Sequence, residues 1–195
     1  PERAGRNMNL LLPALDRADQ DLCPCDAGQL HQCPARQRRI RRKLEFQQLD
    51  LAAIATKAAL EMESIAYEKC VTLETALPEA CILRGNPDYL QRIVSSLLEN
   101  ALKYEPAGGR VNLTLTQDKK KVRLSVQNFG STIPEEDLPH VFDRFYRSDK
   151  SRKSESGSFG LGLAITKEMI EKLGGEIAVS SSAEDGTVLQ VTLCR

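Results

Sequence analysis

The sequence predicts an α+β fold, a two-layer sandwich in which three helices cover one face of a mixed sheet of about five strands. Three observations lead to this prediction. Apolar residues recur at three- and four-residue intervals in three segments, as in amphipathic helices. Apolar and polar residues alternate in several shorter segments, as in strands with one buried face. A long polar stretch, residues 129–159, separates these segments from the last helix and has the length of a lid or binding loop.

The three expected helices cover residues 51–65, 87–104 and 163–173. Asn86 and Pro87 give the second helix a start signal, because proline suits the first helical position. This helix should end near Tyr104, ahead of a proline and two glycines. The third should end at the glycine pair 174–175.

The expected strands are short and separated by turns. Residues 71–74 and 81–84 have strand character on either side of a proline. Residues 111–115 and 122–126 alternate around Asp118 and predict a hairpin. A last hairpin, 177–179 with 188–191, turns around an Asp-Gly pair. Cys70, Cys81 and Cys194 lie in or beside such segments, where a reduced thiol is expected to be a small buried apolar group.

The composition is that of a globular protein in water. The 195 residues include 41% hydrophobic and 28% charged residues, and no apolar run approaches the length of a membrane span. We also expect no signal peptide. The 27 basic residues balance the 27 acidic ones, so the global charge gives no support for nucleic acid binding.

The chain divides into an irregular segment, residues 1–43, and a regular domain, residues 44–195. The first segment contains three prolines and a basic run at 36–43, which we interpret as a solvated linker face, with a lipid or partner contact as the alternative. Four potential zinc ligands also occur there: Cys23, Cys25, His31 and Cys33. Their spacing is too cramped and irregular for paired zinc knuckles, so we favour free thiols.

The second expected helix carries polar residues that suit a magnesium-bound triphosphate. Ser96, Asn100 and Lys103 are three or four residues apart and therefore share one helix face. An amide oxygen is a hard ligand for Mg²⁺, and a cation offsets phosphate charge. Taken alone, the same residues also fit the solvated face of an amphipathic helix.

Two glycine-containing segments follow. Residues 128–134 (Asn-Phe-Gly-Ser-Thr-Ile-Pro) leave a strand, where a side chain can be aimed into a pocket, although such turns are common. Residues 157–165 (Gly-Ser-Phe-Gly-Leu-Gly-Leu-Ala-Ile) open the third helix, whose N-terminal N–H groups suit a phosphate. No Gly-Lys-Ser/Thr follows, so this is not a P-loop. A tight turn is the alternative.

The order and spacing of these segments, over residues ~46–195, resemble the histidine-kinase branch of the ATPase superfamily that also holds gyrase, the heat-shock-90 chaperones and MutL. Residues 98–104 (Leu-Glu-Asn-Ala-Leu-Lys-Tyr) resemble its asparagine box, and 142–147 (Phe-Asp-Arg-Phe-Tyr-Arg) its phenylalanine box. Residues 128–132 and 160–165 resemble the first and second glycine boxes.

The resemblance implies that Glu99 and Lys103 are catalytic, that Asn100 holds Mg²⁺, and that 133–159 form an ATP lid. Glu99 would assist removal of a proton from the incoming histidine. The nucleotide contacts it implies are Ser96, Asn100, Lys103, Tyr104, Asn128, Gly130, Ile133, Phe142, Phe145, Gly160, Leu161, Gly162 and Leu163.

The sequence departs from the family pattern at three positions. Asn128 stands where the family usually has an aspartate that accepts a hydrogen bond from the adenine amino group. An amide oxygen can accept the same bond, so we expect adenine recognition in weaker form. Thr132 replaces a glycine, and Ser96 replaces an asparagine one turn before Asn100, which bears on lid geometry and metal affinity.

By resemblance, the reaction moves the γ-phosphoryl of ATP to a histidine on a separate dimerisation domain. The two histidines here, His31 and His140, lack the family's phosphoacceptor context, so the fragment alone should turn over little. Residues 1–43 would be a linker or a remnant of the dimerisation helices. The implied setting is the cytoplasmic part of a membrane-associated homodimer that works with a response regulator. Two alternatives remain: a regulatory module without catalysis, and a free-standing ATPase or serine kinase.

Overall fold

The computed structural model describes residues 45–130, 132–146 and 160–195, all within the unit Leu44–Arg195. The four potential zinc ligands, the basic run and residues 147–159 of the expected lid lie outside the described residues.

Three α-helices form where the sequence predicted them. They are α2 (Leu51–Glu68), α3 (Pro87–Tyr104) and α5 (Gly162–Lys172), and a short 3₁₀ helix, η1, covers Leu138–His140. Asp50 caps α2 by accepting from Ala52 N at 2.9 Å, and Asn86 caps α3 by accepting from Tyr89 N at 3.0 Å. Each side chain satisfies an N–H group that has no partner within the helix, which fixes where the helix begins.

The main sheet is mixed, as expected. Its strand order is β2-β4-β5-β7-β6, in which β2 and β4 are parallel and the other neighbours antiparallel. The strands are β2 (Thr72–Ala76), β4 (Arg110–Gln117), β5 (Lys121–Asn128), β6 (Glu176–Ser182) and β7 (Gly186–Cys194).

A second, two-stranded sheet pairs β1 (Gln47–Asp50) with β3 (Ile82–Gly85) in antiparallel register. The sequence did not indicate β1, because four residues show no clear alternation. Tertiary contact stabilises it instead, since the Asp50 carboxylate that caps α2 also accepts from Cys81 N at 2.8 Å. The expected strand at 81–84 therefore exists, but it lies outside the main sheet.

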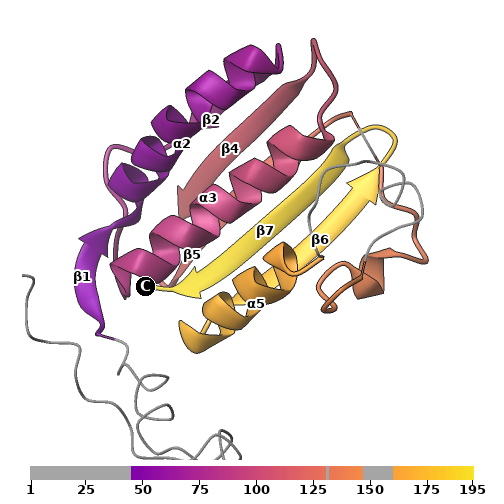
Figure 1. The fold of residues 1–195 in the computed structure, drawn as a ribbon. Coiled ribbons are helices and arrows are strands. Elements are labelled where there is room, and N and C mark those ends of the chain that lie inside the picture. The colour runs from indigo at the N-terminus through magenta and orange to yellow at the C-terminus, as the bar shows by residue number, and fades with distance from the viewer. Residues whose placement is uncertain (1–44, 131, 147–159) are drawn as a thin grey trace, which may run out of the picture. The chain divides into compact units, whose positions relative to one another are not determined.

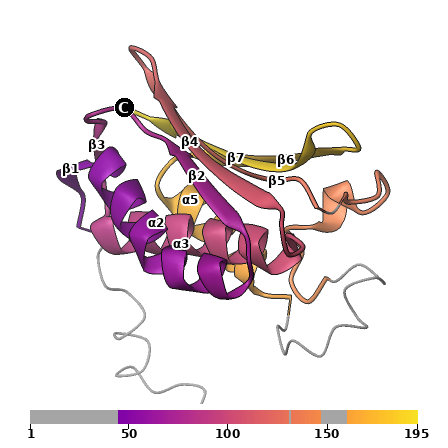
Figure 2. The same cartoon turned by 90° about the horizontal axis from the view of Figure 1, so that it is seen from above.

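The core lies between one face of the main sheet and the three helices, which all lie on the same side (Figures 1 and 2). Alternate strand residues point into it, such as Leu113, Leu124 and Val191. The central helix α3 contacts both α2 and α5. Its buried residues form a continuous apolar stripe: Leu90, Ile93, Val94, Leu97, Leu98, Ala101 and Leu102.

The cysteines follow the expectation only in part. Cys81 is buried, and this burial raises the pKa of its thiol. Cys70 and Cys194 are exposed, so the expectation of buried thiols is wrong for both. Cys70 lies in the tight turn after α2 with a positive φ of 55°, and Cys194 is the last residue of β7, next to the end of the chain. Within the described ranges, no helix has both the length and the apolar character required to cross a bilayer.

We predict that Leu97→Ala lowers the free energy of unfolding by about 2–5 kcal/mol, because it leaves a cavity under α3. Leu97 is 0% exposed, whereas Leu60 on α2 is 59% exposed. Leu60→Ala is therefore the matched control and should change stability by less than about 0.5 kcal/mol. Urea unfolding followed by circular dichroism measures both, and equal losses would contradict the packing described.

Candidate functional site

The last turns of α3 present a polar face. Ser96, Asn100 and Lys103 are half-buried, while Glu99 and Tyr104 are exposed. The apolar residues between them point into the core, which fixes how this helix is rotated. The Lys103 ammonium lies 5.2 Å from the centre of the Tyr104 ring. Ser96, Asn100 and Lys103 thus share one partly exposed face of α3.

A buried hydroxyl joins this face to α5. Thr166 is 0% exposed, and its Oγ1 lies 3.0 Å from Ser96 Oγ and 2.9 Å from the Gly162 carbonyl oxygen. The Thr166 hydroxyl has one proton and can donate to only one of these oxygens at a time. When it donates to the Gly162 carbonyl, the Ser96 hydroxyl donates to Thr166 Oγ1. Ser96 therefore connects α3 to the first turn of α5, a contact that the sequence did not reveal.

The N-terminus of α5 has room for an anion. No side chain among the described residues caps this helix. Among the described residues, a Cβ added to Gly162 would meet only Ser96 Oγ, at 4.0 Å, so these residues leave space beside the first turn. The positive end of the helix dipole and its N–H groups make such a position suitable for phosphate. Leu161, at the start of this helix, is half-buried, and Leu163 packs against the core.

The end of β5 carries a buried polar side chain without a partner. Asn128 is 4% exposed, and its Nδ2 atom makes no hydrogen bond within the part of the chain that the structure describes. A buried amide group left unpaired is costly, so a ligand that binds it recovers that free energy. Thr187, opposite Asn128 in the register, is also buried. It was missed from sequence, where a threonine after a turn glycine is unremarkable.

Thr187 belongs to a short chain of polar contacts. Its hydroxyl lies 2.9 Å from Ser181 Oγ, which accepts from Ile133 N at 2.9 Å. Ile133, expected in the site, is half-buried and is held by β6 through this bond.

The turn after Asn128 is held by an unexpected residue, Glu105. This carboxylate, 7% exposed, accepts from Phe129 N at 2.7 Å, Gly130 N at 2.8 Å and Arg110 N at 3.1 Å. Sequence reasoning missed it, although an acid at the C-terminus of a helix opposes the helix dipole and is a signal of another role. Glycine is needed at position 130 because a Cβ there would lie 1.8 Å from Pro106 Cδ.

The phenylalanine box is anchored on α5. Phe142 packs against the core with the Lys167 ammonium 5.8 Å from its ring centre, and Arg144 pairs with Glu168 at 3.1 Å. Phe145 is 71% exposed and has a φ of 65°.

The same box meets the second glycine box directly. The N–H of Phe145 donates to the Gly160 carbonyl at 3.0 Å. Gly160 has a φ of 67°, and a Cβ there would lie 2.7 Å from the Tyr146 carbonyl oxygen. The structure therefore brings these two expected segments into contact, and both constraints at position 160 require glycine.

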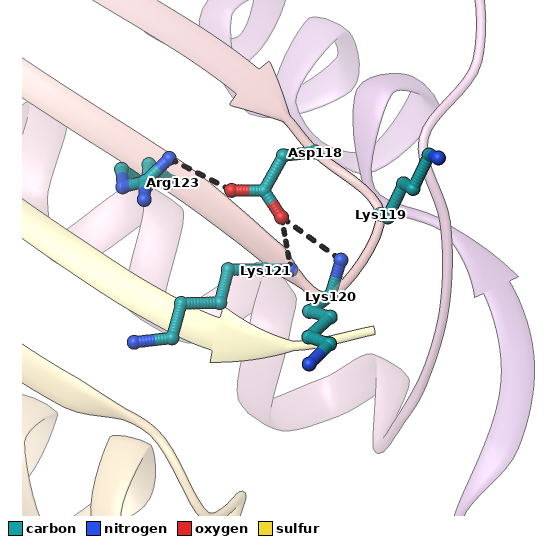
Figure 3. A pocket seen from close by; sticks show the side chains of 5 residues that line it. All are labelled: Asp118, Lys119, Lys120, Lys121 and Arg123. Carbon is teal, nitrogen blue, oxygen red and sulfur yellow. Dashed lines mark hydrogen bonds and ion pairs between the residues drawn. The ribbon is translucent and has the colours of Figure 1, made fainter.

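A shallow hollow at the β4–β5 turn lies at the opposite end of β5 from Asn128 (Figure 3). Asp118 there accepts from Lys120 N and Lys121 N, both at 2.8 Å, and pairs with Arg123. These backbone bonds, the one from Lys120 foremost, lower the pKa of Asp118. Its carboxylate thus stabilises the hairpin turn, and the hollow is no candidate for the site.

Comparisons with known proteins identify the family of this fold. Residues 85–195 match the family described as Histidine kinase-, DNA gyrase B-, and HSP90-like ATPase. Sensor histidine kinase CusS of Escherichia coli (strain K12) is 37% identical over 149 residues, 76% of this chain and 31% of CusS. Sensor histidine kinase WalK of Bacillus subtilis (strain 168) is 41% identical over 108 residues, 54% of this chain and 18% of WalK. The chain therefore spans under a third of the length of either relative.

Among solved structures, the mycobacterial sensor histidine kinase MprB aligns with a TM-score of 0.66 at 28% identity. The alignment covers 77% of this chain and 97% of that one. The fold, the order of the boxes and the family match all agree. The chain belongs to the family of histidine kinase-, DNA gyrase B- and HSP90-like ATPases, and it resembles the catalytic domains of sensor histidine kinases.

Proposed function

We propose that residues 44–195 are the ATP-binding catalytic domain of a two-component sensor histidine kinase, which transfers the γ-phosphoryl of ATP to a histidine on a separate dimerisation domain. One observation carries the proposal. The polar face of α3 lies against the open N-terminus of α5, where Ser96 and Gly162 share the Thr166 hydroxyl. This contact supports the proposal that the metal-binding face of α3 and the phosphate-binding turn of α5 act on one nucleotide.

The described residues fit a nucleotide that extends from Asn128 to α5. The unpaired Nδ2 group of Asn128 would donate to the base, whose edge offers a donor and an acceptor. The phosphates would lie at the first turn of α5, next to Gly160 and Gly162. The remaining contacts would come from Tyr104, Ile133, Phe142, Phe145, Leu161 and Leu163. Residues 147–159, which lie outside the described residues, would complete the lid.

Asn100 and Lys103 would offset the negative charge of the phosphates, Asn100 by binding Mg²⁺ and Lys103 directly. Mg²⁺ keeps several waters and takes few protein ligands, and the Asn100 amide oxygen fits that requirement. When bound, the ion would neutralise charge on the phosphate oxygens. Lys103 is half-buried at the same helix edge and would contact a phosphate. Transfer of a phosphoryl group requires positioning and neutralisation more than covalent chemistry by the protein.

Glu99 would accept the proton of the attacking histidine. Its side chain is exposed on α3, one residue before Asn100, so a histidine from another domain can reach it. The partners we propose are the protein's own dimerisation domain and a response regulator. Residues 1–43 would link to that domain or be a remnant of it, in the cytoplasmic portion of a membrane-associated homodimer.

A second candidate is a module that binds nucleotide and regulates without catalysis. The observation in its favour is Ser96, which replaces the family's asparagine and whose hydroxyl is already bonded to Thr166. This group is therefore less available to the metal shell than an asparagine would be.

We predict that ATP binding depends on Mg²⁺ through Asn100. Asn100→Ala should weaken Mg²⁺-dependent binding at least about 10-fold, because it removes a metal ligand. Calorimetric titration with Mg²⁺ and with EDTA measures this. Asn112→Ala, on the sheet face away from the helices, is the matched control and should bind like the wild type. Equal affinity with and without the metal would remove Asn100 from its proposed role.

We predict that Asn128 reads the base. Asn128→Asp should favour ATP over GTP by a further ~1 kcal/mol, because a carboxylate can only accept and therefore repels the guanine carbonyl. Asn128→Ala should weaken ATP binding while the domain remains folded. Competition between ATP and GTP measures the ratio for each protein. The same ratio in all three would show that Asn128 does not contact the base.

We predict phosphoryl transfer when the dimerisation domain of the full-length protein is supplied as a separate chain. Acid-labile phosphate should appear on that domain, and Glu99→Gln should slow its formation about 10²- to 10⁴-fold with ATP binding unchanged. ATP binding without transfer would favour the regulatory module. ATP turnover in the absence of the added domain would favour a free-standing ATPase.

A further inference from the structure

Glu105 is a buried residue whose carboxylate links the end of α3 to the start of β4 and to the turn after β5. It follows the helix directly, and its own N–H donates to Ala101 O at 3.0 Å. The carboxylate accepts three backbone N–H groups: Oε2 from Phe129 and Gly130, and Oε1 from Arg110. No ion pair of Glu105 occurs among the described residues.

Burying this carboxylate at the C-terminus of a helix costs free energy. Burial penalises a charged carboxylate, and the negative end of the α3 dipole adds repulsion. Three charge-assisted bonds compensate this cost, since each is stronger than a bond between neutral groups. A residue such as threonine would close the helix without burying a charge, so the carboxylate is explained by what it holds.

What Glu105 holds is the peptide unit that follows Asn128. The N–H of this unit, on Phe129, donates to Oε2 at 2.7 Å. Its carbonyl, on Asn128, packs so closely on Gly186 that a Cβ there would lie 2.1 Å from the oxygen. The peptide plane is therefore clamped on both sides, which fixes the backbone from which the unpaired Asn128 amide projects.

The surrounding residues leave space for this one carboxylate. A Cβ on Gly109 would lie 1.9 Å from Glu105 Oε1, so the glycine leaves room for the carboxylate in this position. The Arg110 guanidinium lies 4.3 Å from the centre of the Phe129 ring and covers the turn from outside. Lys103 and Tyr104, at the phosphate end of the proposed site, immediately precede Glu105 in the chain.

We propose that Glu105 is a positioning residue for nucleotide specificity: it locks the turn Phe129–Gly130 onto the end of α3 and so aims the Asn128 amide at the base. The inference rests on the proposed function. Glu105 itself does not contact the nucleotide. Its effect passes through the backbone of the turn.

The test compares Glu105→Gln with Asp50→Asn. Asp50 is the matched control, because its carboxylate also accepts from two backbone N–H groups in separate segments, Ala52 and Cys81. These segments lie at α2 and before β3, outside the proposed site. A glutamine must point its NH₂ group either at Arg110 N or at the two N–H groups of the turn, so it loses at least one of the three bonds and the charge that strengthens the others. Glu105→Gln should raise the Kd for ATP roughly 10-fold and lower the ATP-to-GTP preference. Asp50→Asn, whose amide oxygen can accept both bonds, removes the same charge and should leave the Kd for ATP and the ATP-to-GTP preference unchanged.

Two further readouts separate positioning from general loss of stability. In the Asn128→Ala background, Glu105→Gln should change the Kd for ATP by at most about 2-fold, because the group it positions is gone. Amide hydrogen exchange should accelerate at Phe129 and Gly130 in Glu105→Gln, but not at Ala52. If the glutamine variant does not fold, Glu105→Asp, which keeps the charge but withdraws it from the turn, should show the same loss of base preference.

The outcomes distinguish this inference from the proposed function. A wild-type chain that does not bind ATP would overturn both. ATP binding by the wild type, with an unchanged Kd and ATP-to-GTP ratio in the folded Glu105 variant, would overturn the inference alone. Equal losses from Glu105→Gln with and without Asn128 would also overturn it, because the two residues would then act independently.

Discussion

The main sheet has one apolar face, and the need to cover it determines where everything else lies. Helix α3 covers the centre of this face with a continuous stripe of buried leucine, isoleucine, valine and alanine. Each leucine, isoleucine or valine side chain contributes about 1.5–3 kcal/mol when fully buried, more than a surface polar contact. The apolar stripe therefore fixes the rotation of α3. With that rotation fixed, one polar face of α3 carries Ser96, Asn100 and Lys103, and this face contacts α5 through Ser96.

Two polar links then connect this rigid helix to the segments that would complete a nucleotide site. The Thr166 hydroxyl joins Ser96 to the first turn of α5, and the Glu105 carboxylate joins the end of α3 to the turn after β5. The Thr166 and Glu105 side chains that make these links are buried. Hydrogen bonds away from water are directional and costly to break, so they set positions that apolar packing alone leaves loose.

The same design suits phosphoryl transfer, where the protein must hold groups still rather than react with them. The candidate phosphate position combines the end of a helix dipole with the space that the described residues leave beside Gly162. The candidate base position combines a buried amide with a clamped peptide. α3 lies between them and belongs to the core, so the spacing of the two positions is as rigid as the fold itself.

The sequence by itself determined the elements whose signals are local. α3 runs over the expected residues, Pro87–Tyr104, because its capping asparagine, first-turn proline and apolar periodicity all lie within one segment. The hairpins and the mixed five-stranded sheet follow from alternation in the same way. The sequence also placed Asn128 at a strand end and Ser96, Asn100 and Lys103 on one helix face. Tertiary structure alone decided the pairing of β1 with β3, the exposure of Cys70 and Cys194, and the parts played by Thr166, Thr187 and Glu105. For Thr166 and Glu105 the physical reason is distance along the chain, since their contacts reach residues 70 and 25 positions away, and Thr187 matters because β7 pairs with β5 and so brings it opposite Asn128. No periodicity within a segment encodes such contacts. They exist only after the sheet has been covered.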